Sequence, residues 1–163
     1  MGDVFNLNQQ DALKFFHAYI NEMINLGGEN LPRSISTRLG SKLAKIYKDR
    51  EIESLEQALR ELYEVLGADV KVEKVSEKKF NIRIKHPYQF CPIGGLFDPS
   101  KRERFLEIVC IPYTIGFLKE FNPVNGYQIE LKNCIIRDGG QLCEYDLILN
   151  LKDQLGKLHN VIY

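Results

Sequence analysis

The chain has 163 residues, of which 44% are hydrophobic and 27% are charged, with 22 basic and 22 acidic side chains. These proportions are typical of a soluble globular protein. The length favours one domain, residues 1–163, that can bury a core without disulfides. A net charge of zero provides no basic surface for phosphate backbones and therefore argues against nucleic-acid binding by the chain as a whole.

The sequence shows neither a membrane span nor a secretory signal. No run approaches the roughly 18 apolar residues of a span, and the N-terminal residues are amphipathic rather than basic and then apolar. We therefore expect a cytoplasmic protein whose cysteines stay reduced. The four cysteines are Cys91, Cys110, Cys134 and Cys143.

Apolar residues at helical spacing predict three helices in the N-terminal part of the chain. They are expected at residues 8–26, 34–47 and 55–66. The third helix has the clearest boundaries. Ser54 and Gln57 have the spacing of a capping box, and Gly67 follows the last apolar residue of the pattern.

The rest of the chain predicts two β-hairpins with one helix between them, because apolar and polar residues alternate in pairs of segments joined by turns. The hairpins are expected at residues 70–86 and 127–151. The helix between them starts at the Asp98-Pro99 cap, ends near Phe121, and must bend or break at Pro112. This order favours a four-stranded antiparallel sheet packed with helices, the α+β class.

The two strands of the last hairpin disagree about which face is buried. Cys143 shares an apolar face with Leu147, whereas Cys134 shares a polar face with Glu130. A β-bulge between Lys132 and Cys134 would reconcile the strands and turn Cys134 toward Cys143. Two such thiolates could supply half of a tetrahedral zinc site, although the cysteine spacing matches no zinc-finger pattern. On the residues alone, small buried thiols are the other interpretation.

Two further kinds of site stay open on the residues alone. Cys110 with His86 and Asp98 could act as a thiol, a base and an orienting carboxylate, although no nucleophile motif surrounds Cys110. Aromatic residues also gather around the last helix and the loop before it. They form either a core layer or the wall of an apolar pocket roofed by that loop.

Two segments resemble the 4-vinyl reductase domain family. Cys110 precedes Thr114-Ile115-Gly116-Phe117-Leu118, which matches the Thr-x-Gly-aromatic-Leu helix of the family. Cys134 and Cys143 flank a glycine-containing turn, as the late cysteines of the family do. The resemblance implies an α+β fold related to small subunits of the TRAPP vesicle-tethering complex, with a buried apolar cavity. Members include stand-alone archaeal hydrocarbon-binding proteins and the sensor domains of phenol-responsive activators.

The resemblance also implies a structural zinc ion, which three cysteines and a glutamate hold in those sensor domains. By position, the matching cysteines are Cys110, Cys134 and Cys143. The fourth ligand is either Cys91 or Glu130, because Leu131 stands where the family has its glutamate. A site of four thiolates would be closed to substrate and would therefore stabilise structure.

As a function, the resemblance implies a homodimer that binds or senses a small hydrophobic molecule and signals through a separate partner. The predicted ligand-binding residues are Ile82, His86, Phe105, Tyr113 and Phe117. An enzyme stays an alternative, either a reductase, as the family name suggests, or a hydrolase using the Cys110 thiol. A TRAPP-like assembly subunit is the third hypothesis. The sequence shows no nicotinamide or flavin motif, which disfavours the reductase.

Overall fold

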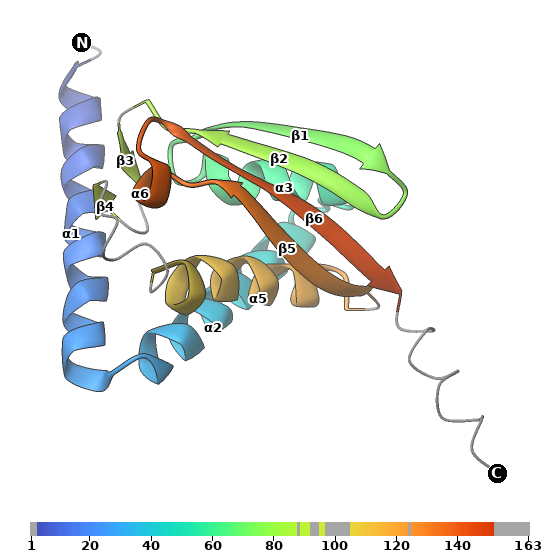
Figure 1. Cartoon of the computed structure of the whole chain (residues 1–163), viewed down its shortest axis with the longest axis horizontal. Helices are drawn as coiled ribbons and strands as arrows, with labels where there is room; N and C mark the ends of the chain where they lie inside the picture. Colours follow the sequence, from blue (N-terminus) through green and yellow to red (C-terminus); the bar gives the residue numbers. More distant parts are fainter. Residues whose placement is uncertain (1–2, 88, 92–94, 97–104, 124, 152–163) are drawn as a thin grey trace.

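A four-stranded antiparallel sheet packed with helices forms the body of the protein, as Figure 1 shows for this computed structural model. The structure describes residues 3–87, 89–91, 95–96, 105–123 and 125–151. The predicted α+β class is confirmed. No helix in the described part of the chain is long and apolar enough to cross a membrane.

The elements follow one another in nearly the predicted order. They are α1 (Asp3–Gly27), α2 (Asn30–Asp49), α3 (Leu55–Glu64), β1 (Asp69–Ser76), β2 (Lys79–Lys85), β3 (Phe90–Cys91), β4 (Gly95–Leu96), the π-helical segment η1 (Leu106–Cys110), α5 (Ile111–Phe121), β5 (Asn125–Asn133), α6 (Ile135–Asp138) and β6 (Leu142–Leu151). The N-cap part of the predicted capping box is confirmed, because Ser54 Oγ accepts a hydrogen bond from the Gln57 amide at 3.4 Å, whereas the Gln57 side chain donates to Glu61 Oε1. Such a bond satisfies one amide that the first helical turn leaves free.

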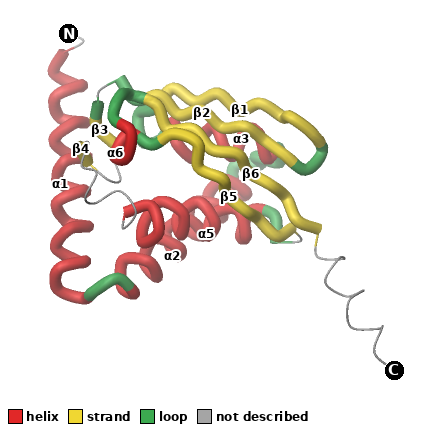
Figure 2. The backbone as a smooth tube through the Cα atoms, viewed as in Figure 1, coloured by secondary structure: helices red, strands yellow, loops and turns green. Residues whose placement is uncertain are grey.

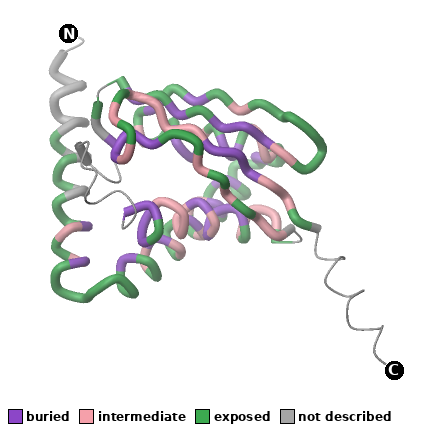
Figure 3. The backbone as a smooth tube through the Cα atoms, viewed as in Figure 1, coloured by how far each residue is buried: buried purple, intermediate pink, exposed green. Residues whose placement is uncertain are grey.

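The main sheet has the strand order β1-β2-β6-β5, with every neighbouring pair antiparallel. Helices α3 and α5 pack against it at β1 and β5, and α2 lies along α5 (Figure 2). Buried positions gather on the central strands β2 and β6, where Ile82 pairs with Tyr145 (Figure 3). The central strands therefore carry much of the apolar core.

The opposite face of the sheet is polar, and Asn81 and Asp146 are buried on it. Asp146 on β6 accepts a hydrogen bond from Asn81 and forms ion pairs with Lys79 and Lys132. Burial alone would raise the pKa of Asp146. The hydrogen bonds from Asn81, Lys132 and Lys79 outweigh burial and hold this pKa well below its usual range.

The predicted bulge in the last hairpin is confirmed by a register shift between Leu131 and Asn133. The strand then ends, and residues 135–138 form the helical turn α6 where the sequence predicts a continuing strand. Asp138 explains this difference, because its Oδ2 accepts a hydrogen bond from the Cys134 amide at 2.8 Å. Gly139 then reverses the chain at a φ of 77°.

Pro112 lies where the helix changes type, so the helical segment is interrupted near the predicted point although both parts stay helical. It lies in the first turn of α5, where a missing amide is tolerated, and η1 supplies a wider turn immediately before it. The predicted helix start at Asp98-Pro99 lies outside the described residues. The helical segment therefore consists of η1 followed by α5, and it carries Cys110 at their junction.

Two hydrophobic clusters make up the interior. One lies between the sheet and helices α2, α3 and α5, and the other joins α1, η1 and α6. Four partly buried side chains pack against both clusters: Leu66, Tyr113, Leu131 and Cys143. The candidate site is built around this boundary.

Candidate functional site

A small cavity of about 50 Å³ lies at the boundary between the two clusters. All four cysteines line it, although they come from β3, η1, β6 and the bend after β5. The remaining lining residues are Tyr63, Leu66, Ile84, His86, Phe105, Leu106, Leu131, Ile136 and Tyr145. The fold thus brings together the thiols that the sequence places far apart.

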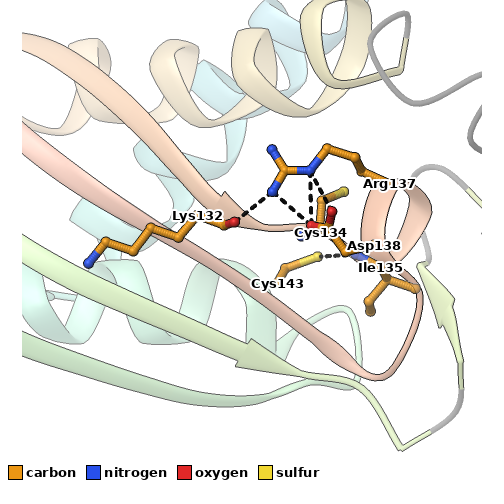
Figure 4. A network of polar contacts seen from close by, with 6 residues as sticks. All are labelled: Lys132, Cys134, Ile135, Arg137, Asp138 and Cys143. Atoms are coloured by element: carbon orange, nitrogen blue, oxygen red, sulfur yellow. Dashed lines mark hydrogen bonds and ion pairs between the residues drawn. The ribbon is translucent and has the colours of Figure 1, made fainter.

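Cys134 and Cys143 both line the cavity, and each affects the pKa of the other thiol. Figure 4 shows both side chains at the end of the hairpin, where the Ile135 amide donates to Cys143 Sγ at 3.4 Å. The hydrogen bond from Cys143, with amide donors at Arg137 and Ile136, outweighs burial and lowers the pKa of Cys134 to about 6. The pKa of Cys143 is raised, first by its hydrogen bond to Cys134 and then by burial.

The Cys110 thiol lacks the lowered pKa that is expected of a catalytic nucleophile. Burial, together with the nearby Cys91 and Cys134, raises the pKa of its thiol well above the usual range. Its proposed base His86 also lines the cavity, but Asp98 lies outside the described residues. These surroundings disfavour a hydrolase that depends on Cys110.

The zinc site stays a prediction from the family resemblance. As the described side chains stand, no three of His, Cys, Asp and Glu are grouped so as to hold a metal ion. The two candidates for the fourth ligand differ in position. Cys91 lines the cavity, whereas Glu130 is exposed, forms a hydrogen bond with Gln128 and belongs to the polar face of the sheet. Of the two, Cys91 is the one near the other thiols.

His86 supplies a neutral imidazole to the cavity wall. The residue is only 6% exposed, and burial lowers its pKa to about 4. Its amide donates to the Gln141 carbonyl at 2.9 Å, which fixes the backbone just beyond β2. A neutral imidazole offers one hydrogen-bond donor and one acceptor to a bound molecule.

A chain of buried hydroxyl groups forms another part of the wall. Tyr63 Oη lies 2.8 Å from Tyr145 Oη and 2.9 Å from Thr114 Oγ1, and Thr114 donates to the Cys110 carbonyl at 3.0 Å. Because Thr114 uses its one proton on that carbonyl, its oxygen accepts from Tyr63, which accepts in turn from Tyr145. Burial raises the pKa of Tyr63 and of Tyr145, so both hydroxyls stay protonated.

A larger apolar groove of about 440 Å³ adjoins the cavity, and Leu66 lines both. Its walls come from α2, the segment after α3, η1 and α5. The lining residues are Ser36, Leu39, Lys42, Leu43, Ile46, Val65, Leu66, Val109 and Tyr113. Several of these apolar side chains are exposed, and Val65 keeps 58% of its surface accessible.

The predicted ligand-binding residues divide between these spaces and the core. His86 and Phe105 line the cavity, and Tyr113 lines the groove. Ile82 and Phe117 are fully buried in the main core and line neither space. Val65 and Leu66 line the groove although they were not among the predicted ligand-binding residues, because the sequence pattern places them at the end of the predicted helix 55–66.

Comparison with known proteins identifies similar folds but no family. No protein-family model and no curated protein matches the sequence, so the 4-vinyl reductase assignment stays a prediction. A solved structure of trafficking protein particle complex subunit 3 from Naegleria fowleri, covalently bound to palmitic acid, matches with a TM-score of 0.62 and 12% identity. That alignment covers 90% of this chain and 99% of the other.

The phenol-responsive sensory domain of the transcription activator PoxR, solved with phenol, is also similar. Its TM-score is 0.56 and its identity is 14%, over 90% of this chain and 80% of that one. The chain therefore has the fold of small TRAPP subunits, which is also that of a sensory ligand-binding domain.

Proposed function

We propose that this protein binds a small, predominantly apolar molecule in the groove between α2, the end of α3 and α5. The observation that carries the proposal is the groove itself. Its volume of about 440 Å³ lies within the range of roughly 300–1,000 Å³ that is typical of small-molecule sites. Its lining is mainly aliphatic, with Tyr113, Ser36 and Lys42 as the polar contributors.

The structural neighbours support this proposal through the chemistry of what they hold. One was solved with palmitic acid and the other with phenol, and both ligands are mainly apolar with one polar end. A shared fold alone does not fix function. The exposed apolar groove of this chain is therefore the main support for ligand binding.

The cavity behind Leu66 would receive the polar end of the ligand. Leu66 lines both spaces, so a change in its rotamer would connect them. Beyond it, His86 and Tyr145 offer hydrogen-bonding groups in an otherwise apolar wall. A ligand with an aliphatic or aromatic body and one hydroxyl or carboxyl group would use both parts.

Two matched variants test the proposal by calorimetric titration with palmitate and with phenol. Val65→Lys places a charge in the groove at a side chain that is already 58% exposed, so the fold should survive. Val75→Lys makes the same change at a side chain that is 57% exposed on β1, away from the groove. We expect the wild-type protein to bind at least one probe. Val65→Lys should weaken the affinity roughly tenfold or more, which corresponds to about 1.4 kcal/mol, and Val75→Lys should leave the affinity unchanged. Equal affinities in both variants, or no binding of either probe, would contradict the proposal.

A further inference from the structure

The hydroxyl chain in the cavity wall has a fixed direction. Thr114 donates to the backbone carbonyl of Cys110, the usual bond of a helical threonine to the residue four positions earlier. Since each hydroxyl has one proton, Tyr63 donates to Thr114 at 2.9 Å, and Tyr145 donates to Tyr63 at 2.8 Å. The chain therefore ends at the Tyr145 oxygen, which has used its proton and keeps its lone pairs.

The end of this chain determines which polar group the site accepts. Tyr145 lines the cavity behind Leu66, so its oxygen is placed to receive a hydrogen bond there. We propose that the site selects aliphatic alcohols, whose uncharged hydroxyl group donates to Tyr145 Oη, and disfavours the carboxylate of the same chain length. This selectivity rests on the proposed function, because the aliphatic chain must lie in the groove before its hydroxyl group can enter the cavity.

A carboxylate does not match the end of the hydroxyl chain. An ionised carboxylate only accepts hydrogen bonds, and the Tyr145 oxygen is also an acceptor as long as its proton lies toward Tyr63. Neutral His86 can donate one hydrogen bond but provides no positive charge to balance the carboxylate. Transfer of such a charge from water to a mainly apolar wall is strongly unfavourable. An alcohol carries no charge and supplies the proton that Tyr145 lacks.

The groove supports the same choice of ligand. Its walls are mainly aliphatic, with Leu39, Leu43 and Ile46 from α2 facing Val65, which suits an alkyl chain. Of the described residues that line it, only Lys42 is charged, and this lysine is exposed. An ion pair with an exposed lysine contributes little. A carboxylate that stayed outside at Lys42 would therefore gain less than an alcohol whose hydroxyl group enters the cavity.

Three ligands with the same alkyl chain test this selectivity by calorimetric titration of the full chain at about pH 8. They are 1-octanol, octanoate, which is ionised at this pH, and 1-fluorooctane, in which a fluorine of similar size replaces the hydroxyl group. We expect 1-octanol to bind roughly fivefold or more tightly than either of the others, the effect of one neutral hydrogen bond. A preference for apolar ligands alone would instead favour 1-fluorooctane.

Three tyrosine variants test the role of the hydroxyl chain. Tyr145→Phe removes the acceptor, so the affinities for 1-octanol and 1-fluorooctane should become equal within about twofold. Tyr63→Phe frees the Tyr145 proton, so the affinity for octanoate should rise relative to that for 1-octanol. Tyr127→Phe is the matched control, because the Tyr127 hydroxyl donates to the Asn122 carbonyl at 2.9 Å, and it should leave all three affinities unchanged.

The outcomes separate this selectivity from ligand binding itself. If the wild-type protein binds octanoate or 1-fluorooctane as tightly as 1-octanol, the selectivity is wrong and binding in the groove stands. A preference for 1-octanol that persists in Tyr145→Phe would also overturn the selectivity. If none of the three ligands binds, the proposed function fails and the selectivity fails with it. Since the wild-type affinities decide between these outcomes, a variant that does not fold leaves the test intact.

Discussion

Gly40 of α2 and Gly116 of α5 lie at a helix crossing where the two backbones touch. A Cβ atom on Gly40 would lie 2.1 Å from the Tyr113 carbonyl oxygen, and one on Gly116 would lie 2.2 Å from the Thr37 carbonyl oxygen. Each glycine therefore faces the main chain of the other helix, which cannot rotate away as a side chain could. This crossing sets the distance between α2 and α5, the two long helices that border the groove.

Replacing either glycine should separate these helices. We expect Gly40→Ala and Gly116→Ala each to lower the free energy of unfolding by about 3 kcal/mol, the upper part of the range for overpacked cores. Urea denaturation monitored by circular dichroism measures the change. Gly27→Ala is the control, because its nearest neighbour is the movable Cδ2 of Leu31 at 2.8 Å, and its effect should stay within about 1 kcal/mol. Equal effects at all three positions would show that the crossing is not tightly packed.

The hydroxyl chain in the cavity wall predicts which of two tyrosine variants loses more stability. Tyr63→Phe removes the middle member and leaves the Tyr145 and Thr114 oxygens without their shared partner, which should cost about 1–3 kcal/mol of stability. Tyr145→Phe removes only the terminal hydroxyl and should cost less, about 0.5–1.5 kcal/mol. Chemical denaturation of both variants tests this order. A larger loss of stability in Tyr145→Phe than in Tyr63→Phe would contradict the donor-to-acceptor order from Tyr145 to Tyr63 to Thr114.

The buried imidazole of His86 predicts how stability depends on pH. Its pKa is about 4 in the folded protein and about 6.5 when unfolded, so between these values the unfolded chain binds more protons. The free energy of unfolding should therefore fall as the pH drops from about 6.5 to about 4, by up to about 3 kcal/mol. Above this window His86 has no effect.

The variant His86→Gln isolates this contribution, because glutamine does not titrate. Denaturation of wild type and variant across the same pH range should give curves that diverge only within the window. The low pKa of Asp146 contributes stability that is lost progressively as the pH falls below about 5, but wild type and variant share this loss, so it cancels from the difference between their curves. Parallel curves would show that His86 is solvated in the folded protein.

Local sequence patterns predict most of the fold. The three N-terminal helices and the first hairpin follow from periodicity, because one amphipathic face of each element is buried. The bulge near Lys132 was also predictable, since Cys134 and Cys143 otherwise fall on opposite faces. The helical turn α6 was not predictable from the sequence. Adjacent Ile135 and Ile136 favour a strand, and the helical turn depends on the hydrogen bond from the Cys134 amide to Asp138.

The candidate site was only partly predictable, because it depends on packing between distant segments. Val65 and Leu66 line the groove together with α2 residues that are distant in the sequence, so their proximity depends on how α3 packs. Phe117 was predicted to line a pocket, yet it stacks on Phe121 at 5.7 Å and meets Tyr47 edge-on at 5.6 Å inside the core. An aromatic residue at helical spacing fits a core and a pocket equally well, so the sequence does not distinguish them.

The most direct test of apolar-ligand binding is NMR of methyl-labelled leucine and valine during titration with palmitate or phenol. If the groove is the site, one of these ligands will shift the methyl signals of Leu39, Leu43 and Val65 and leave Val75 unchanged. Saturable shifts confined to those groove residues would support the account. Shifts that spread equally to Val75, or no saturable shifts with either ligand, would contradict it.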